Sequence, residues 1–450
     1  MSYKLPFSDI AEVVMGQSPK KENVNTDSNG FPLLNGPTEF SARCPVPIQF
    51  TTSGKKFSEP NDILFCVRGS AGRMNYADQK YAIGRGIAAI RGRSGYPTPY
   101  VRAVIEQNLD RLLISATGSI FPNVGRDLLL SFEVEVSSLK EAKVANDLFV
   151  AFEDKIEINR QTNQTLEKIA QAIFKSWFID FDPVNAKIEV LETGDGVDEA
   201  ELAAMGVIAA KSPDELAELK QSKPEAYEKL AQTAALFPSA MQESELGEIP
   251  EGWDVSTIGD QVQITGGGTP STKNPAYWED GTVNWTTPKD LSNLTDKLLT
   301  DTERKITESG LEKISSGLLP VDTVLMSSRA PVGYLALVKI PVAINQGYIA
   351  MQCKKRLTPE FVLQWASSNM DEIKQRASGT TFAEISKKNF RPISVIVPSE
   401  DIVSAYREKA KTIYDTIYSF SEEIKTLSSI RNTTLSPLLS GEIELRETNP

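Results

Sequence analysis

The sequence predicts an α+β protein: two mixed α/β domains joined by two long antiparallel coiled-coil helices, with an internal pseudo-twofold repeat. The first observation is that two distant stretches resemble each other, because Ile83 and Gly86 lie 261 positions before Ile344 and Gly347. The second is that short β-rich runs, bounded by Gly, Pro, Asn and Ser, fill the start of each half. The third is that a long heptad pattern follows each set of runs.

The repeat extends through further blocks, which indicates a duplicated module rather than two halves of different kinds. Residues matched at the same separation are Gly118 with Gly379, Ser119 with Thr380, Phe121 with Phe382, Leu166 with Leu427, and Ile169 with Ile430. Upstream, GQSP at positions 16–19 resembles GGTP at positions 267–270 with a shift of about ten residues.

Composition narrows the class of protein. The 40% apolar and 24% charged fractions are ordinary for a soluble globular protein, and 450 residues leave room for two to four domains. No apolar run approaches the roughly 18 residues of a membrane span, and MSYKLPFSDI has no signal-peptide stretch, so we expect a cytoplasmic protein. Three scattered cysteines share no metal-ligand spacing. The absence of histidine removes His-dependent triads and His-ligated zinc, whereas carboxylate or lysine chemistry remains possible.

The net charge of −12 is concentrated in one segment. Lys187 to Glu248 holds 14 acidic and 5 basic residues, whereas basic residues cluster elsewhere. Local charge decides phosphate binding, because salt limits the reach of a distant charge to about 8–10 Å. A nucleic-acid partner is therefore compatible with this acidic chain.

Residues 1–138 are predicted to form the first mixed domain. Strands are expected at Asp62–Val67, Gly86–Ile90 and Phe132–Val136, and a helix around Tyr100–Ser115.

Residues 139–186 are predicted to be a long coiled-coil helix. Its apolar seam is Phe149, Phe152, Ile156, Asn159, Asn163, Leu166, Ala170, Ile173 and Trp177. Polar seam residues such as Asn159 and Asn163 fix the register of a helix pair. The simpler alternative is that each helix lies on its own domain. A helix of about 30–35 residues spans about 45–52 Å, a little more than one turn of B-DNA at about 34–36 Å. Two paired helices with a recognition module at each end would therefore measure distance along DNA.

The second half is predicted to repeat this organisation after an acidic, partly helical linker at 187–248, in which Ser212–Glu215 is a capping-box pattern. The second domain, 249–398, is expected to contain strands at Thr323–Ser328, Gly347–Met351 and Ile393–Pro398 and a helix over Pro359–Arg376. Residues 399–450 carry the second seam: Ala410, Ile413, Ile417, Phe420, Ile424, Leu427, Arg431, Thr434 and Leu438.

Two segments resemble catalytic motifs, but each lacks a part that the motif requires. The glycine-dense Gly266–Pro270 lacks the Lys-Ser/Thr of a phosphate-binding P-loop. Asn274–Tyr277 resembles the Asn-Pro-Pro-Tyr/Phe motif of amino-methyltransferases, but one proline is missing and no glycine-rich S-adenosylmethionine loop precedes it. A nuclease or methyltransferase acting alone is therefore disfavoured.

The chain resembles the specificity (S) subunit of type I restriction–modification enzymes over nearly its whole length. The strings that carry the resemblance are GEIPEGW (247–253), LEKIAQAIFKSWFIDFDPV (166–184), LSPLLSGEIEL (435–445), GGGTP (266–270), NWTTPKDL (284–291) and SSRAPVGY (327–334). The resemblance implies two target-recognition domains and two conserved helical regions. It also implies a non-catalytic, sequence-specific DNA-binding scaffold with a bipartite target, acting in phage defence. Two modification subunits and the restriction subunits would be its partners, and S-adenosylmethionine, ATP and Mg would be bound by those partners rather than by this chain. The alternative is an orphan or regulatory scaffold of the same family.

Candidate DNA contacts are small-residue loops with Arg, Lys, Ser, Thr, Asn and Gln, which can reach phosphates and base edges. They are Arg68, Ser70, Arg73, Arg85, Thr117 and Ser119 in the first domain, and Lys289, Ser328, Arg329, Asn345, Gln346, Ser378, Thr380, Thr381 and Lys387 in the second. FKSWFIDF (174–181) is expected to expose aromatic anchors for the modification subunits. Candidate partner-binding residues are Phe174, Trp177, Phe178, Leu438 and Leu439. The alternative is that these side chains pack on the neighbouring recognition domain.

Overall fold

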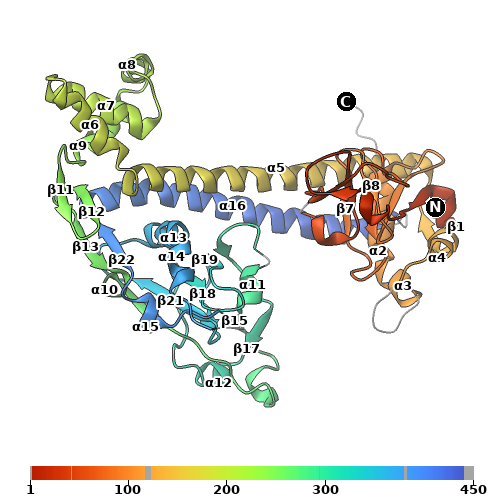
Figure 1. Ribbon diagram of the computed structural model, residues 1–450. Helices are drawn as coiled ribbons and strands as arrows, with labels where there is room; N and C mark the ends of the chain where they lie inside the picture. The colour runs from red at the N-terminus through yellow and green to blue at the C-terminus, as the bar shows by residue number, and fades with distance from the viewer. Residues whose placement is uncertain (1–2, 42, 117–122, 293, 380–382, 440–450) are drawn as a thin grey trace. The chain divides into compact units, whose positions relative to one another are not determined.

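The computed structural model describes residues 3–41, 43–116, 123–292, 294–379 and 383–439 (Figure 1). The chain forms two compact units. The first consists of Met1–Asn159 with Glu422–Pro450, and the second of Arg160–Ser421. Both units contain strands and helices, as the predicted α+β class requires. No helix in the described part of the chain is long and apolar enough to cross a membrane.

The first unit is built around two small sheets. One has the strand order β2 (Ala11–Met15), β9 (Ile87–Gly92), β6 (Ile63–Cys66), β7 (Met74–Tyr76). The other has the order β3 (Val24–Asn25), β5 (Gln49–Thr51), β4 (Phe31–Leu34), β8 (Ala82–Ile83). The remaining strand pair is β1 (Tyr3–Pro6) with β10 (Glu133–Val136), and the helices are α1 (Phe7–Ile10), η1 (Lys21–Asn23), η2 (Pro37–Glu39), α2 (Thr98–Gln107), α3 (Leu109–Ile114) and α4 (Arg126–Ser131).

Strand β6 shows why these residues form a central strand. Its side chains point alternately to opposite faces of the sheet, and both faces are buried. Ile63 and Phe65 belong to the core that contains Tyr100 of α2, whereas Leu64 and Cys66 belong to the core on the opposite face. A continuous apolar run is the pattern expected of a strand covered on both sides.

The second unit repeats the topology. Its larger sheet has the order β14 (Val262–Thr265), β21 (Tyr348–Cys353), β18 (Val324–Ser327), β19 (Leu335–Val338), β16 (Leu298–Leu299), and its smaller sheet the order β17 (Arg304–Ile306), β15 (Val283–Thr286), β20 (Ala343–Ile344). Strand β13 (Asp254–Thr257) pairs with β22 (Ser394–Val397). The helices of this fold are α10 (Ile258–Gln261), η3 (Pro275–Tyr277), α11 (Pro288–Ser292), α12 (Glu308–Leu311), α13 (Pro359–Ser368), α14 (Met370–Gln375) and α15 (Lys387–Phe390).

The constant separation of the two copies is confirmed element by element. Strands β6, β8 and β9 correspond to β18, β20 and β21, and α2 corresponds to α13; each pair starts at the separation that relates Ile83 to Ile344. The upstream shift is confirmed as well, because β2 and β14, which start at Ala11 and Val262, are closer together by ten positions. The duplicated module is therefore visible in the backbone, not only in scattered matching letters.

Two 40-residue helices, α5 (Leu139–Phe178) and α16 (Glu400–Leu439), each contribute one half to each unit. In the first unit Asn159 Nδ2 donates to Glu423 Oε2 at 2.8 Å. In the second unit Asn163 Nδ2 donates to Ser421 Oγ at 3.0 Å, and the ring of Trp177 lies 6.1 Å from that of Tyr406. Residue numbers rise along α5 as those of its partners on α16 fall, so the predicted antiparallel helix pairing is confirmed.

The acidic segment between α5 and β13 forms helices with a small core of their own. It contains α6 (Asp182–Glu192), α7 (Val197–Ala209), α8 (Pro213–Ser222), α9 (Pro224–Ala235) and the hairpin β11 (Met241–Ser244) with β12 (Gly247–Pro250). The core consists of Ala204, Met205, Leu216, Leu230 and Ala234. The capping box at Ser212 and Glu215 is present as predicted. The acidic segment therefore has an apolar interior beneath its charged surface.

Candidate nucleic-acid interface

In each unit, three loops and the residues just before a short helix meet at one edge of the fold. In the first unit Val67, after β6, donates its amide to Gly86 O at 2.9 Å and accepts from Val124 N at 3.0 Å. In the second unit Ser328, after β18, makes the same two bonds, with Gly347 O at 2.8 Å and Ile385 N at 3.0 Å. We call these places the first and second recognition edges: residues 16–18, 67–73, 84–86 and 123–126, and residues 267–269, 328–334, 345–347 and 384–387.

Glycines allow the loops that follow β2 and β14 to reach these edges. A Cβ atom on Gly16 would lie 2.2 Å from Gly84 O, and one on Gly267 would lie 1.9 Å from Ile344 O. Both contacts are with backbone atoms, so no side-chain movement could relieve them. The resemblance between GQSP and GGTP thus reflects one shared close approach of two loops.

The first recognition edge is rich in arginine. Arg68, Ser70, Arg73 and Arg85, all candidates from the sequence, are exposed there. Arg68 Nε donates to Asn123 Oδ1 at 3.1 Å, and the backbone amide of Arg85 donates to the hydroxyl of Ser18 at 3.3 Å. Two further candidates, Thr117 and Ser119, lie outside the described residues.

The second recognition edge has different chemistry. Arg329 faces the carboxylate of Glu384 at 3.7 Å, so its charge is partly balanced. Backbone bonds of 2.9 Å in both directions join Ser378 to Glu384, which holds the exposed Ser378 beside this ion pair. Gln346 is exposed, and its Oε1 accepts from Thr269 Oγ1 at 2.6 Å.

Other candidate DNA contacts of the second unit are buried, bonded within the turn or outside the described residues. Ser328 is only 4% exposed, so the expectation of an exposed contact there is wrong: its backbone supports the edge from beneath. Asn345 Oδ1 accepts from Gly347 N at 2.8 Å and so shapes the turn. Thr380 and Thr381 lie outside the described residues.

Two lysines are candidates here: Lys387 belongs to the second recognition edge, and Lys289 lies outside its defined residues. Lys289 is exposed on α11 and pairs with Glu303 at 2.8 Å, and this hydrogen bond and the carboxylate charge raise the pKa of Lys289. Lys387, the first residue of α15, is exposed, and its Nζ lies 2.8 Å from where a Cβ on Gly266 would be. The missing side chain at Gly266 therefore leaves the space that the Lys387 ammonium occupies.

The predictions from the sequence did not include Arg126, an exposed cation of the first recognition edge. Arg126 is the first residue of α4, as Lys387 is of α15, and it is exposed. The constant separation of the two copies in the sequence could have identified Arg126, because this separation places Arg126 and Lys387 at the same point of the two edges. Each edge thus carries one cation at the start of its short helix.

The expectation that FKSWFIDF exposes its aromatic rings is wrong. Phe174, Trp177 and Phe178 are 2%, 1% and 5% exposed. The end of α5 packs against α13 and the start of α16, where Phe178 lies 4.9 Å from Phe361 and 5.1 Å from Tyr406 between ring centroids. These side chains form the core of the second unit and are not available as a docking surface.

The other partner-binding candidates lie at the end of α16. Leu438 is 4% exposed and belongs to the core of the first unit, so it is not available to a partner. The side chain of Leu439 lies outside the described residues.

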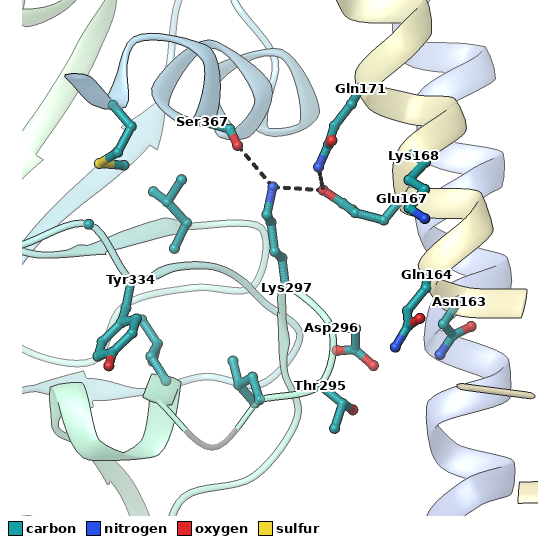
Figure 2. A pocket seen from close by; sticks show the side chains of 15 residues that line it. Asn163, Gln164, Glu167, Lys168, Gln171, Thr295, Asp296, Lys297, Tyr334 and Ser367 are labelled. Atoms are coloured by element: carbon teal, nitrogen blue, oxygen red, sulfur yellow. Dashed lines mark hydrogen bonds and ion pairs between the residues drawn. The ribbon is translucent and has the colours of Figure 1, made fainter. Parts of the chain in front are cut away.

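A cleft of about 530 Å³ lies in the second unit between α5 and the loop that follows α11, lined by both polar and apolar residues. Figure 2 shows Lys297 reaching toward the helix, where its Nζ lies 2.8 Å from Glu167 Oε1 and donates to Ser367 Oγ at 3.0 Å. Beside it, Ser421 Oγ of α16 donates to Asp296 Oδ2 at 2.6 Å. Adjacent residues of this loop are thus bonded to α5, α13 and α16, which fixes this part of the unit on its helices.

Groups with strongly shifted pKa values lie in the cores rather than at the recognition edges. Burial raises the pKa of Cys353 to about 12 and that of Tyr76 to about 12. Burial also raises the pKa of the Glu360 carboxyl, although the nearby Arg407 opposes this change. These shifts follow from desolvation, so they describe packing rather than an acid or base prepared for chemistry. Among the described residues, no group of three or more His, Cys, Asp or Glu is arranged to hold a metal ion.

Comparison with known proteins gives consistent matches. The family model described as the type I restriction modification DNA specificity domain matches residues 4–168 and 250–433. The HindI specificity subunit of Haemophilus influenzae is 31% identical over 406 residues, which cover 86% of this chain and 88% of that protein. The MjaIX specificity subunit of Methanocaldococcus jannaschii is 36% identical over 167 residues, or 37% of this chain and 38% of that protein. The crystal structure of a type I restriction–modification system S subunit from M. genitalium superposes with a TM-score of 0.52 at 15% identity, covering 99% of this chain and 97% of that one.

Proposed function

This chain belongs to the type I restriction–modification DNA specificity family, and from that premise we propose that it is a non-catalytic subunit that reads a bipartite DNA target, one half-site per unit. The observation that carries the proposal is the pair of recognition edges. They share one backbone construction, with matching bonds at Val67 and Ser328, but differ in the side chains they expose. A common backbone with different polar groups suits two modules that read different short sequences.

The charge on these edges supports duplex DNA as the ligand. The first edge exposes Arg68, Arg73, Arg85 and Arg126, within a chain whose net charge is −12. Cations gathered at one place attract phosphates even when the whole molecule is acidic, because salt screens charges more than about 8–10 Å away.

The proposal extends to the assembly. A specificity subunit with two repeated units offers two equivalent places for modification subunits, through which restriction subunits would join. S-adenosylmethionine, ATP and Mg would then be bound by those partners and not by this chain. Purified chain incubated with DNA, S-adenosylmethionine and Mg²⁺ should neither methylate nor cleave, and either activity in the absence of partner subunits would contradict the proposal.

Exchange of one recognition unit tests the bipartite target. Replacing residues 1–138 by the corresponding domain of another specificity subunit should change one half-site and leave the other unchanged, because each edge is built within its own unit. The measurement is a map of methylated bases in cells that express the hybrid with its modification and restriction subunits. A change in both half-sites would contradict one-unit, one-half-site reading.

Removal of the helix-start cations tests the phosphate contacts. Arg126→Ala and Lys387→Ala should each weaken binding to cognate and random DNA by a similar factor. Each should also reduce the slope of log K against log salt by about 0.9, since one fewer counterion is released. Lys223→Ala is the matched control, because Lys223 is an exposed cation between α8 and α9 and belongs to neither set of edge residues. Loss of affinity for cognate DNA alone would assign these residues to base reading instead.

A further inference from the structure

Gln346 is held at the tip of a rigid turn. It lies in the connection between β20 and β21 and is exposed, whereas its neighbour Gly347 is buried. Gly347 N donates to Asn345 Oδ1 at 2.8 Å, and Gly347 O accepts from Ser328 N at 2.8 Å. The backbone on either side of Gln346 is therefore fixed, and its side chain starts from a defined point.

The side-chain amide of Gln346 is oriented as well. Thr269, in the neighbouring glycine loop, donates its hydroxyl to Gln346 Oε1 at 2.6 Å. This bond turns Oε1 toward the loop and Nε2 away from it. Within the described part of the chain, the second lone pair of Oε1 and the two Nε2 protons stay available to a ligand, so Gln346 offers one acceptor and one donor side by side.

We propose that Gln346 reads an adenine in the half-site bound by the second unit. In the major groove adenine offers the N7 acceptor beside the N6 amino donor, which a glutamine amide can match with two hydrogen bonds. Guanine offers two acceptors at N7 and O6, cytosine offers a donor, and thymine offers an acceptor and a methyl group. Of the four bases, adenine alone satisfies both the donor and the acceptor of the oriented amide.

The corresponding position of the first unit carries a different side chain. Arg85 lies in the equivalent turn between β8 and β9, two positions after Ile83, as Gln346 lies two positions after Ile344. An arginine presents donors only, so it cannot make the donor–acceptor pair that adenine requires. This way of reading adenine is therefore proposed for the turn of the second unit and not for the equivalent turn of the first.

The inference rests on the proposed function, and the experiment separates the two. The full chain with its modification subunits is first used to select its target from a random DNA pool. Each adenine of the selected target is then replaced, one at a time, by 7-deazaadenine, which lacks the N7 acceptor. We expect one position in the second half-site at which this replacement weakens binding by about 3- to 30-fold, and at which Gln346→Ala removes the effect.

Base preference at that position gives a second measurement. The wild-type complex should favour adenine over the other bases by about 5- to 150-fold, and Gln346→Ala should bring this ratio close to one. Thr269→Val should lower the ratio in part, because the amide is then free to turn. Gln232→Ala, at an exposed glutamine of α9, should leave the ratio unchanged.

The outcomes are distinct. A complex that selects no sequence overturns the proposed function. A complex that selects a bipartite target with no adenine in the second half-site overturns the inference alone. The same is true if the 7-deazaadenine penalty persists in full in Gln346→Ala.

Discussion

Replacing Phe178 with alanine is expected to lower the free energy of unfolding of the second unit by about 3–5 kcal/mol, the cost of deleting a well-packed aromatic ring. Phe178 is 5% exposed, and its ring lies 4.9 Å from that of Phe361 and 5.9 Å from that of Trp253. The change removes ring–ring contacts among α5, α13 and the chain before β13, and the surrounding residues cannot close the gap fully.

Tryptophan fluorescence during urea unfolding is a suitable measurement for this variant. All five tryptophans of the chain, at positions 177, 253, 278, 285 and 365, lie in the second unit, so the signal reports that unit selectively. Ile179→Ala is the matched control, because Ile179 is the next residue and 44% exposed, and it should change stability by less than about 0.5 kcal/mol. If Phe178→Ala kept wild-type stability and instead lost a modification subunit, the assignment of Phe178 to the core would be wrong.

Periodic features of the sequence predicted the fold well. The seam through Ile156, Asn159 and Ile417 was found because a coiled-coil repeat is local: neighbouring turns of one helix display it without knowledge of the partner. The constant separation between the two copies then related the strands and helices from β6 onward to those from β18 onward, since two copies of one fold share their element order.

Contacts between distant segments could not be predicted in this way. FKSWFIDF was interpreted as an exposed aromatic surface because the residues that cover it, Phe361 and Tyr406, are distant in the sequence. They follow the acidic segment and most of the strands of the second unit. The acidic composition of 187–248 likewise hid the small core around Leu216. In both cases the sequence shows which side chains are apolar but not which distant surface covers them.

The candidate site was predicted at the level of loops rather than of individual contacts. Arg68, Arg85 and Gln346 are exposed at the recognition edges, as expected for polar residues beside glycines. Ser328 has the same composition around it but is buried, because its backbone joins the loop of Gly347 to that of Ile385. Burial of this kind depends on tertiary hydrogen bonds that leave no pattern in the sequence.

Lengthening both long helices is expected to change the spacing between the half-sites. The insertion points are Asn159–Arg160 in α5 and Ser421–Glu422 in α16, where the boundary between the units crosses each helix. Asn159 pairs with Glu423 on one side of this boundary and Asn163 with Ser421 on the other. Because the helices are antiparallel, equal insertions preserve both pairings, whereas an insertion in α5 alone shifts one against the other.

The length of the insertion decides the result. One heptad in each helix keeps the seam in phase and adds about 10 Å, or about three base pairs at 3.4 Å each. Three base pairs also rotate a half-site by nearly a third of a turn of B-DNA, so binding should weaken even when the spacer is matched. Three heptads add about 32 Å, or about nine base pairs, which is close to the 10–10.5 base pairs of a full turn. This longer variant should therefore bind tightly to a target whose spacer is nine to ten base pairs longer.

Selection of the preferred spacer from DNA pools with the half-sites fixed and the spacer varied is the measurement. The two variants have the same seam chemistry and differ only in length, so a general loss of stability would affect both. Tight binding by the three-heptad variant at the original spacer would show that helix length does not set the distance. Equal binding by the one-heptad and three-heptad variants to their matched targets would show that the units can rotate about the DNA independently of the helices.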